Sequence, residues 1–179
     1  MNNRSDVQFD ILEASLQRLS ARMPDTPVAG IMLSRLMLNL GRGMAGMLEQ
    51  QIRPFGLAEA EFRVLTTLFS QPEGVAHPSE LCARTSQSPA NMSRISDALV
   101  SRDLITRVLS AHDRRRMVLR ITEQGEELVR RLLPVLFAPL REMLKDFSDA
   151  EQHQLIAQLK RLGMRVDQVT AAESPEPGS

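Results

Sequence analysis

Residues 86–102 have the sequence SQSPANMSRISDALVSR, which predicts a helix with a capped start and two chemically different faces. Ser88 is a good N-cap, and Pro89 suits the first helical position because proline has no N–H to leave unpaired. At about 100° per residue, three apolar side chains share one face: Met92, Ile95 and Leu99. The opposite face has short, polar side chains around Arg94. This pattern is typical of a helix that packs with one face and binds with the other.

The polar face of this predicted helix has the chemistry of a DNA-recognition helix. Short side chains near a helix N-terminus allow the backbone to approach base edges in the major groove, and arginine pairs with guanine through two hydrogen bonds. The residues predicted to contact DNA are Ser88, Pro89, Ala90, Asn91, Ser93 and Arg94. The alternative is a solvent-facing helix in which Arg94 and Asp97 pair with each other.

The flanking segments have the order of a winged helix-turn-helix. Residues 58–70 and 79–85 have the apolar spacing of two helices, the second of them short. Residues 104–109 and 117–121 contain β-branched residues on either side of a polar tip, which predicts a β-hairpin. Helix, short helix, tight turn, helix and hairpin therefore occupy residues 56–121, the predicted DNA-binding domain.

The tip of the predicted hairpin carries three consecutive arginines. Asp113 precedes Arg114, Arg115 and Arg116. Burial of so many charges is costly, so these arginines are expected in solvent at the end of a wing. There they can contact phosphates and enter the narrow minor groove, while Asp113 orients a neighbouring arginine or caps the turn. We predict all four as DNA-binding wing residues.

The charge distribution supports a polyanionic partner although the whole chain is neutral. The chain has 179 residues with 22 basic and 22 acidic side chains. Residues 76–121 hold eight arginines against four carboxylates, a net charge of +4, between flanks with net charges of −1 and −3. A local positive region, rather than the total charge, steers a protein toward DNA. A basic face that is merely solvated is the alternative interpretation.

Several motifs in this region resemble the MarR family of transcription regulators. They are residues 79–81 (SEL), 94–99 (RISDAL), 103–105 (DLI) and 113–116 (DRRR), followed by Leu119 and residues 121–125 (ITEQG). The resemblance covers about residues 28–168, and the N-terminal extension is most similar to the EmrR-type branch of multidrug-efflux repressors. It implies a homodimer on a palindromic operator of double-stranded DNA. It also implies that a small aromatic or lipophilic ligand relieves repression of an efflux or stress-response operon.

The segments outside the predicted DNA-binding domain are expected to form a helical dimerisation core. Apolar residues at helical spacing predict helices over 6–19 and 28–52, within an N-terminal dimerisation segment 1–55. The first half of the second helix is apolar around most of its circumference, so it needs cover from a second subunit. The predicted fold is therefore mainly α with a small β-hairpin wing (α+β). It is a winged helix-turn-helix whose N- and C-terminal helices form a dimerisation core.

The C-terminal segment 122–170 is predicted to supply further dimerisation helices. Pro134 and Pro139 are expected to kink or interrupt the first of them. An apolar stripe from Leu155 to Val169 predicts the last helix. Residues 171–179 are rich in proline and polar residues and are predicted to be a disordered tail.

A candidate effector pocket lies on the long N-terminal helix. Three glycines lie close together beside flexible methionines, at Gly41, Gly43 and Gly46. Glycine inside a helix costs about 1 kcal/mol relative to alanine, so the cluster indicates a bend, a close helix contact or room for a ligand. The predicted pocket residues are Arg35, Leu40, Met44, Met47 and Phe62.

Other functions have weaker support. Cys82, the single cysteine, is expected to be a small core residue, and the alternative is a redox-responsive repressor that acts through its thiol. A DNA-binding architectural protein without an effector also remains possible, and it would bind with little sequence preference.

Catalysis and membrane insertion are not predicted. The sequence has no Ser/His/Asp order, Gly-rich phosphate loop or paired-carboxylate motif, so we expect neither an enzyme nor a cofactor. One cysteine and three scattered histidines give no metal cluster. Without a long apolar run or a secretory signal in residues 1–10, we expect a cytoplasmic protein with no membrane partner.

Overall fold

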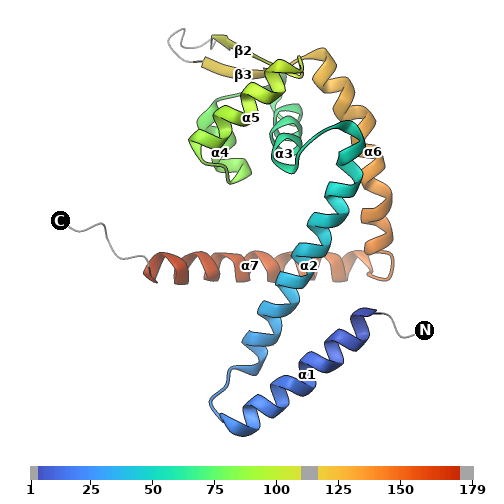
Figure 1. Ribbon diagram of the computed structural model, residues 1–179, viewed down its shortest axis with the longest axis vertical. Helices are drawn as coiled ribbons and strands as arrows, with labels where there is room; N and C mark the ends of the chain where they lie inside the picture. Colours follow the sequence, from blue (N-terminus) through green and yellow to red (C-terminus); the bar gives the residue numbers. More distant parts are fainter. Residues whose placement is uncertain (1–3, 110–116, 174–179) are drawn as a thin grey trace, which may run out of the picture. The chain divides into compact units, whose positions relative to one another are not determined.

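The computed structural model describes residues 4–109 and 117–173, in two compact units with a boundary between Val129 and Arg130 (Figure 1). The helices of the first unit are α1 Arg4–Arg22, α2 Val28–Ile52, α3 Glu59–Phe69, α4 Pro78–Thr85 and α5 Pro89–Ser101. Its strands are β1 Val75–Ala76, β2 Ile105–Leu109 and β3 Met117–Ile121, and short 3-10 turns cover Arg53–Phe55 and Pro72–Gly74. The last helices are α6 Glu123–Met143, which spans the boundary, and α7 Asp149–Glu173 in the second unit.

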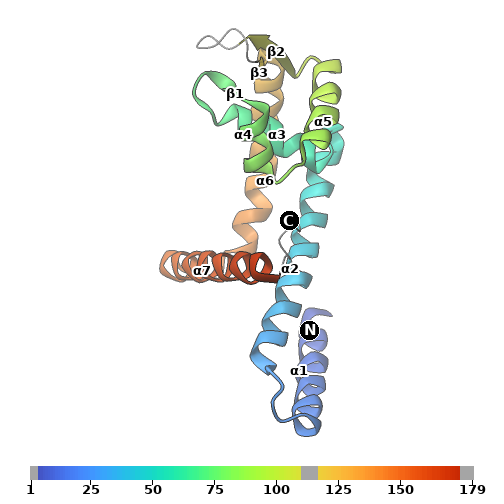
Figure 2. The same ribbon diagram turned by 90° about the vertical axis from the view of Figure 1, so that its left-hand side faces the viewer.

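The three strands form one antiparallel sheet in the order β1, β3, β2 (Figure 2). β2 and β3 pair from Ile105 opposite Ile121 to Leu109 opposite Met117, which confirms the predicted hairpin strands. β1 lies on the other edge of β3 and was not predicted. Two residues are too few for an alternating apolar pattern to be recognised in a sequence.

The apolar core of the first unit lies in residues 56–129, which we call the central lobe. In this lobe α3 contacts α4, α5 and β3, and α5 contacts β2. The most deeply buried apolar side chains of the lobe are Val64, Leu65, Leu68, Leu81, Met92, Leu99, Ile105 and Val129. The core thus confirms the predicted order of helix, short helix, turn, helix and hairpin.

The two N-terminal helices have little core of their own. α1 packs against α2 through Leu12 and Leu16, which are 8% and 3% exposed. Of the 25 residues of α2, all of them described, Ile52 alone is fully buried. Large apolar side chains stay exposed along this helix: Leu33, Met37, Leu38, Leu40 and Met44. α2 has the predicted bounds, whereas α1 is longer than the predicted range 6–19 because helix-compatible residues continue to the break before Pro24.

α6 is a single helix that contains Pro134 and Pro139. Of the two predicted effects, an interruption of the helix is therefore excluded, while a kink at these prolines stays a prediction. A proline removes one N–H donor from the helix, but the hydrogen bonds of the turns on either side remain, and they are sufficient to continue the helix.

α7 extends to Glu173, three residues into the segment predicted to be disordered. The prediction is wrong for residues 171–173 because alanine and glutamate are strong helix formers. Residues 174–179 lie outside the described part of the chain. Within the described part, no helix combines the length and the apolar character that a membrane span requires.

Candidate nucleic-acid interface

The predicted recognition helix is α5, and side-chain hydrogen bonds fix its first turn. The Ser88 hydroxyl accepts a hydrogen bond from the Asn91 N–H, with an N–O distance of 3.2 Å, as an N-cap residue does. The Asn91 side-chain amide donates to the Gln87 side-chain oxygen, and Pro89 occupies the first helical turn. The helix therefore begins where the sequence predicted it.

The two faces of α5 are also those that the sequence predicted. The apolar face is buried, with exposures of 1% for Met92, 6% for Ile95 and 0% for Leu99. The residues predicted to contact DNA lie on the other side, where Asn91 is half-buried and the rest are exposed: Ser88, Pro89, Ala90, Ser93 and Arg94. The lobe therefore presents a rigid, polar helix face that is open to a partner.

The arginines of the basic region divide into two groups. Arg102, Arg107 and Arg120 form hydrogen bonds within the lobe. Arg84 and Arg94 are exposed, and within the described ranges neither has a hydrogen bond or an ion pair. The net charge of the region thus overstates the number of arginines that are free to bind phosphate, since several of them form hydrogen bonds within the lobe.

An ion pair joins the recognition helix to the hairpin. Arg107 on β2 donates to the carboxylate of Asp97 on α5, with an N–O distance of 2.5 Å. The alternative in which Asp97 pairs with Arg94 is therefore wrong. Both side chains are largely exposed, at 61% for Asp97 and 41% for Arg107, so the pair adds at most about 1 kcal/mol to stability. The pair links the exposed face of α5 to strand β2.

Sequence reasoning missed this ion pair. The two residues are ten positions apart, on a helix and on a strand, and no spacing rule places such residues opposite each other. Arg107 was counted only as part of the basic region. The helix periodicity did place Asp97 on the exposed face, but its partner follows from the three-dimensional packing of α5 on β2.

The first turn of α6 is bound to the turn that follows α5. The Thr122 hydroxyl donates to the Asp103 carbonyl (2.6 Å), and the Thr122 N–H donates to the Leu104 carbonyl (3.1 Å). The Gln124 side chain donates to the Arg102 carbonyl (3.2 Å). These bonds hold the end of the recognition helix and the base of the wing in one rigid corner.

Gly125 makes this corner possible. A Cβ atom at residue 125 would lie 2.1 Å from the Leu104 carbonyl oxygen and 2.8 Å from Ile121 Cγ1, far inside van der Waals contact. The glycine in the motif at residues 121–125 is therefore required by the close approach of α6 to the backbone before β2. The sequence motif indicated the family, and the structure supplies the physical reason for its glycine.

The predicted wing residues Asp113, Arg114, Arg115 and Arg116 lie outside the described residues. The strands that lead to them are described up to the pair Leu109 and Met117, which are 58% and 45% exposed. The described part of the ladder thus extends up to the predicted tip, and its last apolar side chains are exposed.

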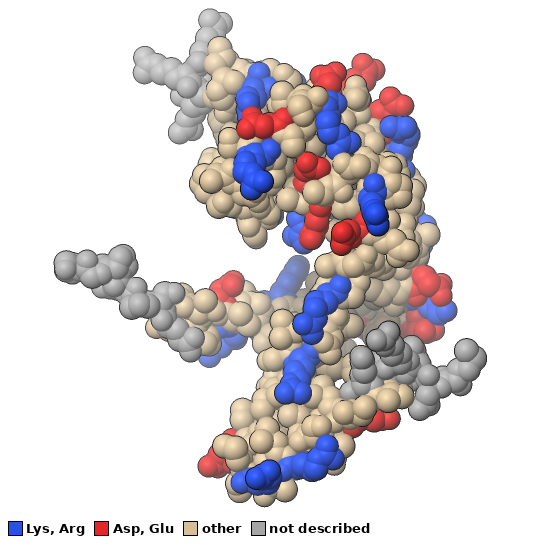
Figure 3. Space-filling model, viewed as in Figure 1, with Lys and Arg blue, Asp and Glu red and all other residues tan. Residues whose placement is uncertain are grey.

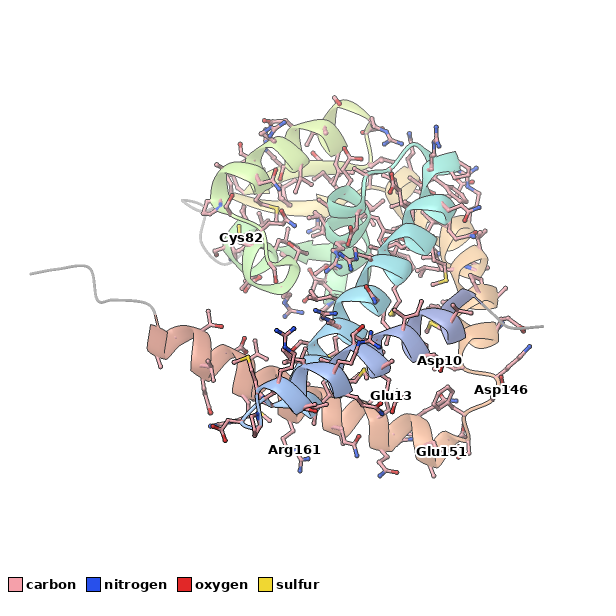
Figure 4. All side chains as sticks on the ribbon, turned by 60° about the horizontal axis from the view of Figure 1, so that its bottom comes forward. Asp10, Glu13, Cys82, Asp146, Glu151 and Arg161 are labelled. Atoms are coloured by element: carbon pink, nitrogen blue, oxygen red, sulfur yellow. The ribbon has the colours of Figure 1, made fainter. Side chains whose placement is uncertain are left out.

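A groove of about 840 Å³ lies between α4, α5 and the hairpin strands. Its lining includes Cys82, Met92, Arg107 and Met117. Cys82 is a free thiol that is half-buried, so it is not the fully buried core residue that the sequence predicted (Figure 4). One side of Cys82 borders the groove.

The residues predicted for the effector pocket lie at different heights along α2 and on α3. Arg35 lines a separate groove between α1 and α2. It lies twelve residues before Met47, which is about 18 Å along the axis of α2 and too far for one small ligand to contact both. Leu40 and Met44 are exposed on α2, whereas Phe62 on α3 is half-buried.

The described residues hold no group of three or more His, Cys, Asp or Glu side chains that is placed to bind a metal ion. The space around the glycines of α2 is also open: a Cβ at Gly41, Gly43 or Gly46 would meet no atom within 4 Å. The close helix contact that these glycines indicated is therefore not formed by the described residues of this chain, while a bend or room for a ligand stays a prediction.

Comparison with known proteins identifies relatives of the lobe and of nearly the whole chain. The sequence model of the MarR family matches residues 55–116. The Escherichia coli transcriptional repressor MprA is 32% identical over 164 residues, which is 92% of this chain and 93% of the relative. This similarity thus extends beyond the lobe into the terminal helices.

Solved structures show the same fold. The crystal structure of AbsC, a MarR family transcriptional regulator from Streptomyces coelicolor, has a TM-score of 0.69 and 25% identity, covering 76% of this chain and 93% of that one. CouR from Rhodococcus jostii, solved in complex with p-coumaroyl-CoA, has a TM-score of 0.67 and 23% identity, covering 73% and 90% of the two chains. The predicted winged helix-turn-helix is confirmed by these similarities.

Proposed function

Because the chain belongs to the MarR family of transcriptional regulators, we propose that it is a homodimeric repressor that releases a palindromic DNA operator when a small ligand binds. The family consists of transcriptional regulators, so the chain is not an enzyme. The observation that carries the proposal is the capped helix α5, whose apolar face is buried while the polar face around Arg94 is open.

Repression and the regulated genes are parts of this proposal. The relative from Escherichia coli is named a transcriptional repressor, and its similarity covers almost the whole of this chain. We extend repression to this chain and, from the resemblance of its N-terminal extension, to an operon for efflux or stress response. A chromosomal operator would place the protein in the cytoplasm.

The exposed apolar surface of the terminal helices supports a homodimer. Leu33, Leu38 and Leu40 on α2 are each more than half exposed. On α7 the exposed apolar side chains are Leu155, Ile156, Leu159, Met164, Val166 and Val169. A surface of this kind is unfavourable in water, and a second copy is the simplest partner that covers it in every molecule. We expect an interface above about 2,000 Å², as in other obligate dimers.

The DNA contact follows from the geometry of α5. Small residues at its start allow the backbone to approach the base edges, and Arg94 is long enough to pair with a guanine. In a two-fold dimer the two copies of α5 enter successive major grooves, about 10 base pairs apart, which requires a palindromic operator. Arg115 and its neighbours in the wing would contact phosphates or the minor groove.

Release by a ligand requires that the ligand bind the DNA-free arrangement more tightly. A hundredfold loss of DNA affinity corresponds to a coupling free energy of about 2.7 kcal/mol, and linkage makes DNA weaken ligand binding by the same factor. The contacts that we propose for a lipophilic effector are the exposed Leu40 and Met44 and the half-buried Met47 of α2, together with Phe62 of α3.

The test measures binding to duplexes that contain an inverted repeat from upstream of the coding region. Arg94→Ala should reduce discrimination between the repeat and a scrambled duplex by about 1–3 kcal/mol. Arg115→Ala should weaken binding to both duplexes and lower the salt slope by about 1. The matched control is Arg63→Ala on α3, where the arginine pairs with Glu59 outside the proposed interface.

Two results would contradict the proposal. The first is unchanged DNA affinity and salt dependence in both the Arg94 and the Arg115 variants. The second is sedimentation of the wild-type chain as a folded 20.0 kDa monomer at micromolar concentration.

A further inference from the structure

Two side-chain amides form a short chain of hydrogen bonds at the start of the recognition helix. Gln87, in the turn between α4 and α5, donates from its Nε2 to the Thr85 carbonyl at 3.2 Å. Its Oε1 accepts a hydrogen bond from the Nδ2 of Asn91, in the first turn of α5. Both amide side chains are half-buried. The chain of bonds therefore links the end of α4 to a side chain that is proposed to contact DNA.

The Thr85 carbonyl sets the direction of both amides. A carbonyl only accepts hydrogen bonds, so the group of Gln87 that faces it is the NH2. The Gln87 oxygen then points to Asn91, whose own NH2 donates to it. An amide in solvent can take either direction, because its oxygen and nitrogen have nearly the same size. Here the backbone selects one direction for both side chains.

The backbone around the two amides is fixed as well. Ser86 has a φ of 54°, in the left-handed region, and the Gln87 N–H donates to the Cys82 carbonyl at 3.0 Å. These features close the C-terminus of α4 in a tight turn. The Asn91 N–H donates to the Ser88 hydroxyl at 3.2 Å. Asn91 is thus held by hydrogen bonds through both its main chain and its side chain.

The hydrogen-bonding groups that remain on Asn91 match the edge of adenine. Among the described residues, none donates to the Asn91 Oδ1, and the Nδ2 keeps a second hydrogen. The amide therefore offers one acceptor and one donor to a partner. In the major groove adenine presents the complementary pair, the N6 donor and the N7 acceptor, whereas guanine presents two acceptors, N7 and O6. The Asn91 amide thus favours adenine over guanine.

Charged contacts do not supply this discrimination. Figure 3 shows basic and acidic side chains on the face of the lobe turned to the viewer, with uncharged surface between them. Contacts between arginine and phosphate hold a protein on the duplex but carry no sequence information directly. The identity of a base has to be read by groups with a defined direction, as in the Asn91 amide.

We propose that Asn91 reads an adenine in each half-site and that Gln87 is a positioning residue that holds the Asn91 amide in the required direction. The inference rests on the proposed function, because it requires α5 to enter the major groove. Asn91 and Arg94 are separated by a rise of about 4.5 Å along α5, close to the spacing of about 3.4 Å between base pairs. The adenine should therefore lie within one or two base pairs of the guanine assigned to Arg94.

Gln87 contributes by preparing the Asn91 amide before DNA binds. Without the Gln87 oxygen, the Asn91 side chain rotates in solvent and has to be ordered during binding, which costs conformational entropy. The freed NH2 group also reaches other acceptors, such as guanine O6 or a phosphate. Loss of Gln87 should therefore lower the preference for adenine more than it lowers the total affinity for DNA.

The test measures the base preference of the full-length protein. Duplexes with randomised half-sites are selected for binding, and every single-base variant of the selected duplex is then titrated in competition. The wild type should prefer adenine over guanine about tenfold at one position of each half-site. Asn91→Ala should abolish this preference. Gln87→Met, which keeps the side-chain length but not the hydrogen bonds, should reduce it about threefold and leave the guanine position of Arg94 unchanged.

Gln71→Met is the matched control for the loss of a hydrogen-bonded glutamine. Gln71 is half-buried in the same lobe, between α3 and β1, and its Nε2 donates to the Thr67 carbonyl at 3.4 Å. This variant should keep the full preference for adenine. The double variant of Gln87→Met and Asn91→Ala should have the same base preferences as Asn91→Ala alone, because Gln87 acts through Asn91.

Two results would overturn the inference and leave the proposed function intact. One is an unchanged preference for adenine in Asn91→Ala. The other is a Gln87→Met variant that loses affinity equally for all four bases, or no more than the Gln71→Met control. In both cases the wild-type protein still selects an inverted repeat. A wild-type protein that selects no sequence would contradict the proposed function itself, and the inference with it.

Discussion

The central lobe and the terminal helices have opposite patterns of burial. α3 has 11 residues and buries Val64, Leu65 and Leu68, whereas α2 has 25 residues and buries Ile52 alone. The lobe carries a complete apolar core within one chain. The terminal helices present apolar side chains that only another surface can cover. Folding of the lobe and assembly of the terminal helices should therefore respond to different mutations.

The largest expected effect comes from a pair of single variants in which leucine is replaced by alanine, one in each region. Leu68→Ala in α3 removes a side chain with 0% exposure and should lower the free energy of unfolding by about 2–5 kcal/mol. Leu159→Ala in α7 removes a side chain that is 44% exposed in the single chain, so its main effect should be on dimerisation. Chemical denaturation and sedimentation at several protein concentrations measure the two quantities.

A clear division between the two variants would sharpen the comparison. Leu68→Ala should leave the dimer dissociation constant of the folded protein unchanged, while Leu159→Ala should raise it. If Leu159→Ala changed neither property, the exposed stripe of α7 would have no role in assembly. The conclusion that the terminal helices need a second copy to cover them would then be wrong for α7.

The next effect concerns the corner between α5 and α6. Gly125→Ala should destabilise the lobe by about 1–3 kcal/mol, because the added Cβ would overlap the Leu104 carbonyl oxygen. Gly163→Ala in α7, where a Cβ would meet no atom within 4 Å, is the control and should be neutral or stabilising. Thermal unfolding compares the two. A Gly125→Ala variant as stable as the wild type would show that the corner is not closely packed.

A smaller effect on stability is expected from the Asp97–Arg107 ion pair. Asp97→Asn should cost less than about 1 kcal/mol, because both side chains are largely exposed. Binding to non-operator DNA should nevertheless increase, since a negative charge leaves the α5 face, and preference for the operator should fall as α5 loses its tie to β2. Glu59→Gln, which breaks the exposed Arg63–Glu59 pair of α3, should change neither affinity. Equal DNA binding by both variants would contradict an orienting role.

The smallest effect is expected at the start of α7. The hydroxyl and the backbone N–H of Ser148 both donate to the Glu151 carboxylate, which lowers the pKa of Glu151 below its ordinary value. The stabilisation is therefore complete above the ordinary glutamate pKa and is lost as the pH falls through the lowered pKa of the folded state. Ser148→Ala should raise the pKa of Glu151, and Ser148→Thr should preserve it. An NMR titration of Glu151 that is the same in both variants would exclude the hydroxyl as a cause.

Local rules predicted the elements that local interactions determine. The cap at Ser88, the two faces of α5 and the strands at 105–109 and 117–121 follow from residue type and spacing within a few positions. The same rules did not predict β1, because a strand of two residues is too short to show an alternating apolar pattern. For Pro134 and Pro139 they allowed a kink or an interruption, and the structure excludes the interruption because the rest of the helix tolerates the lost hydrogen bonds.

The site was predicted less completely than the fold, because part of it depends on contacts between distant segments. The exposed face around Arg94 follows from helical periodicity, but the pairing of Asp97 with Arg107 depends on how α5 packs on β2. The effector residues were grouped by their chemistry along α2. The predicted helix over 28–52 already implied that Arg35 and Met47 lie about 18 Å apart along its axis, and the structure confirms that helix.

The short strand β1 has a consequence for the order in which the lobe folds. Its pairing of Val75 with Arg120 joins two points whose intervening chain contains α4, α5 and the hairpin. β2 and β3 are close in sequence and can pair early, but the β1–β3 pair closes a long loop and must wait until the intervening helices are compact. Formation of β1 should thus coincide with the rate-limiting step, and its amide protons should exchange only when the whole lobe opens. A lobe that has not yet formed β1 would then already contain a compact recognition helix, so β1 pairing would report the last step of folding rather than the formation of α5.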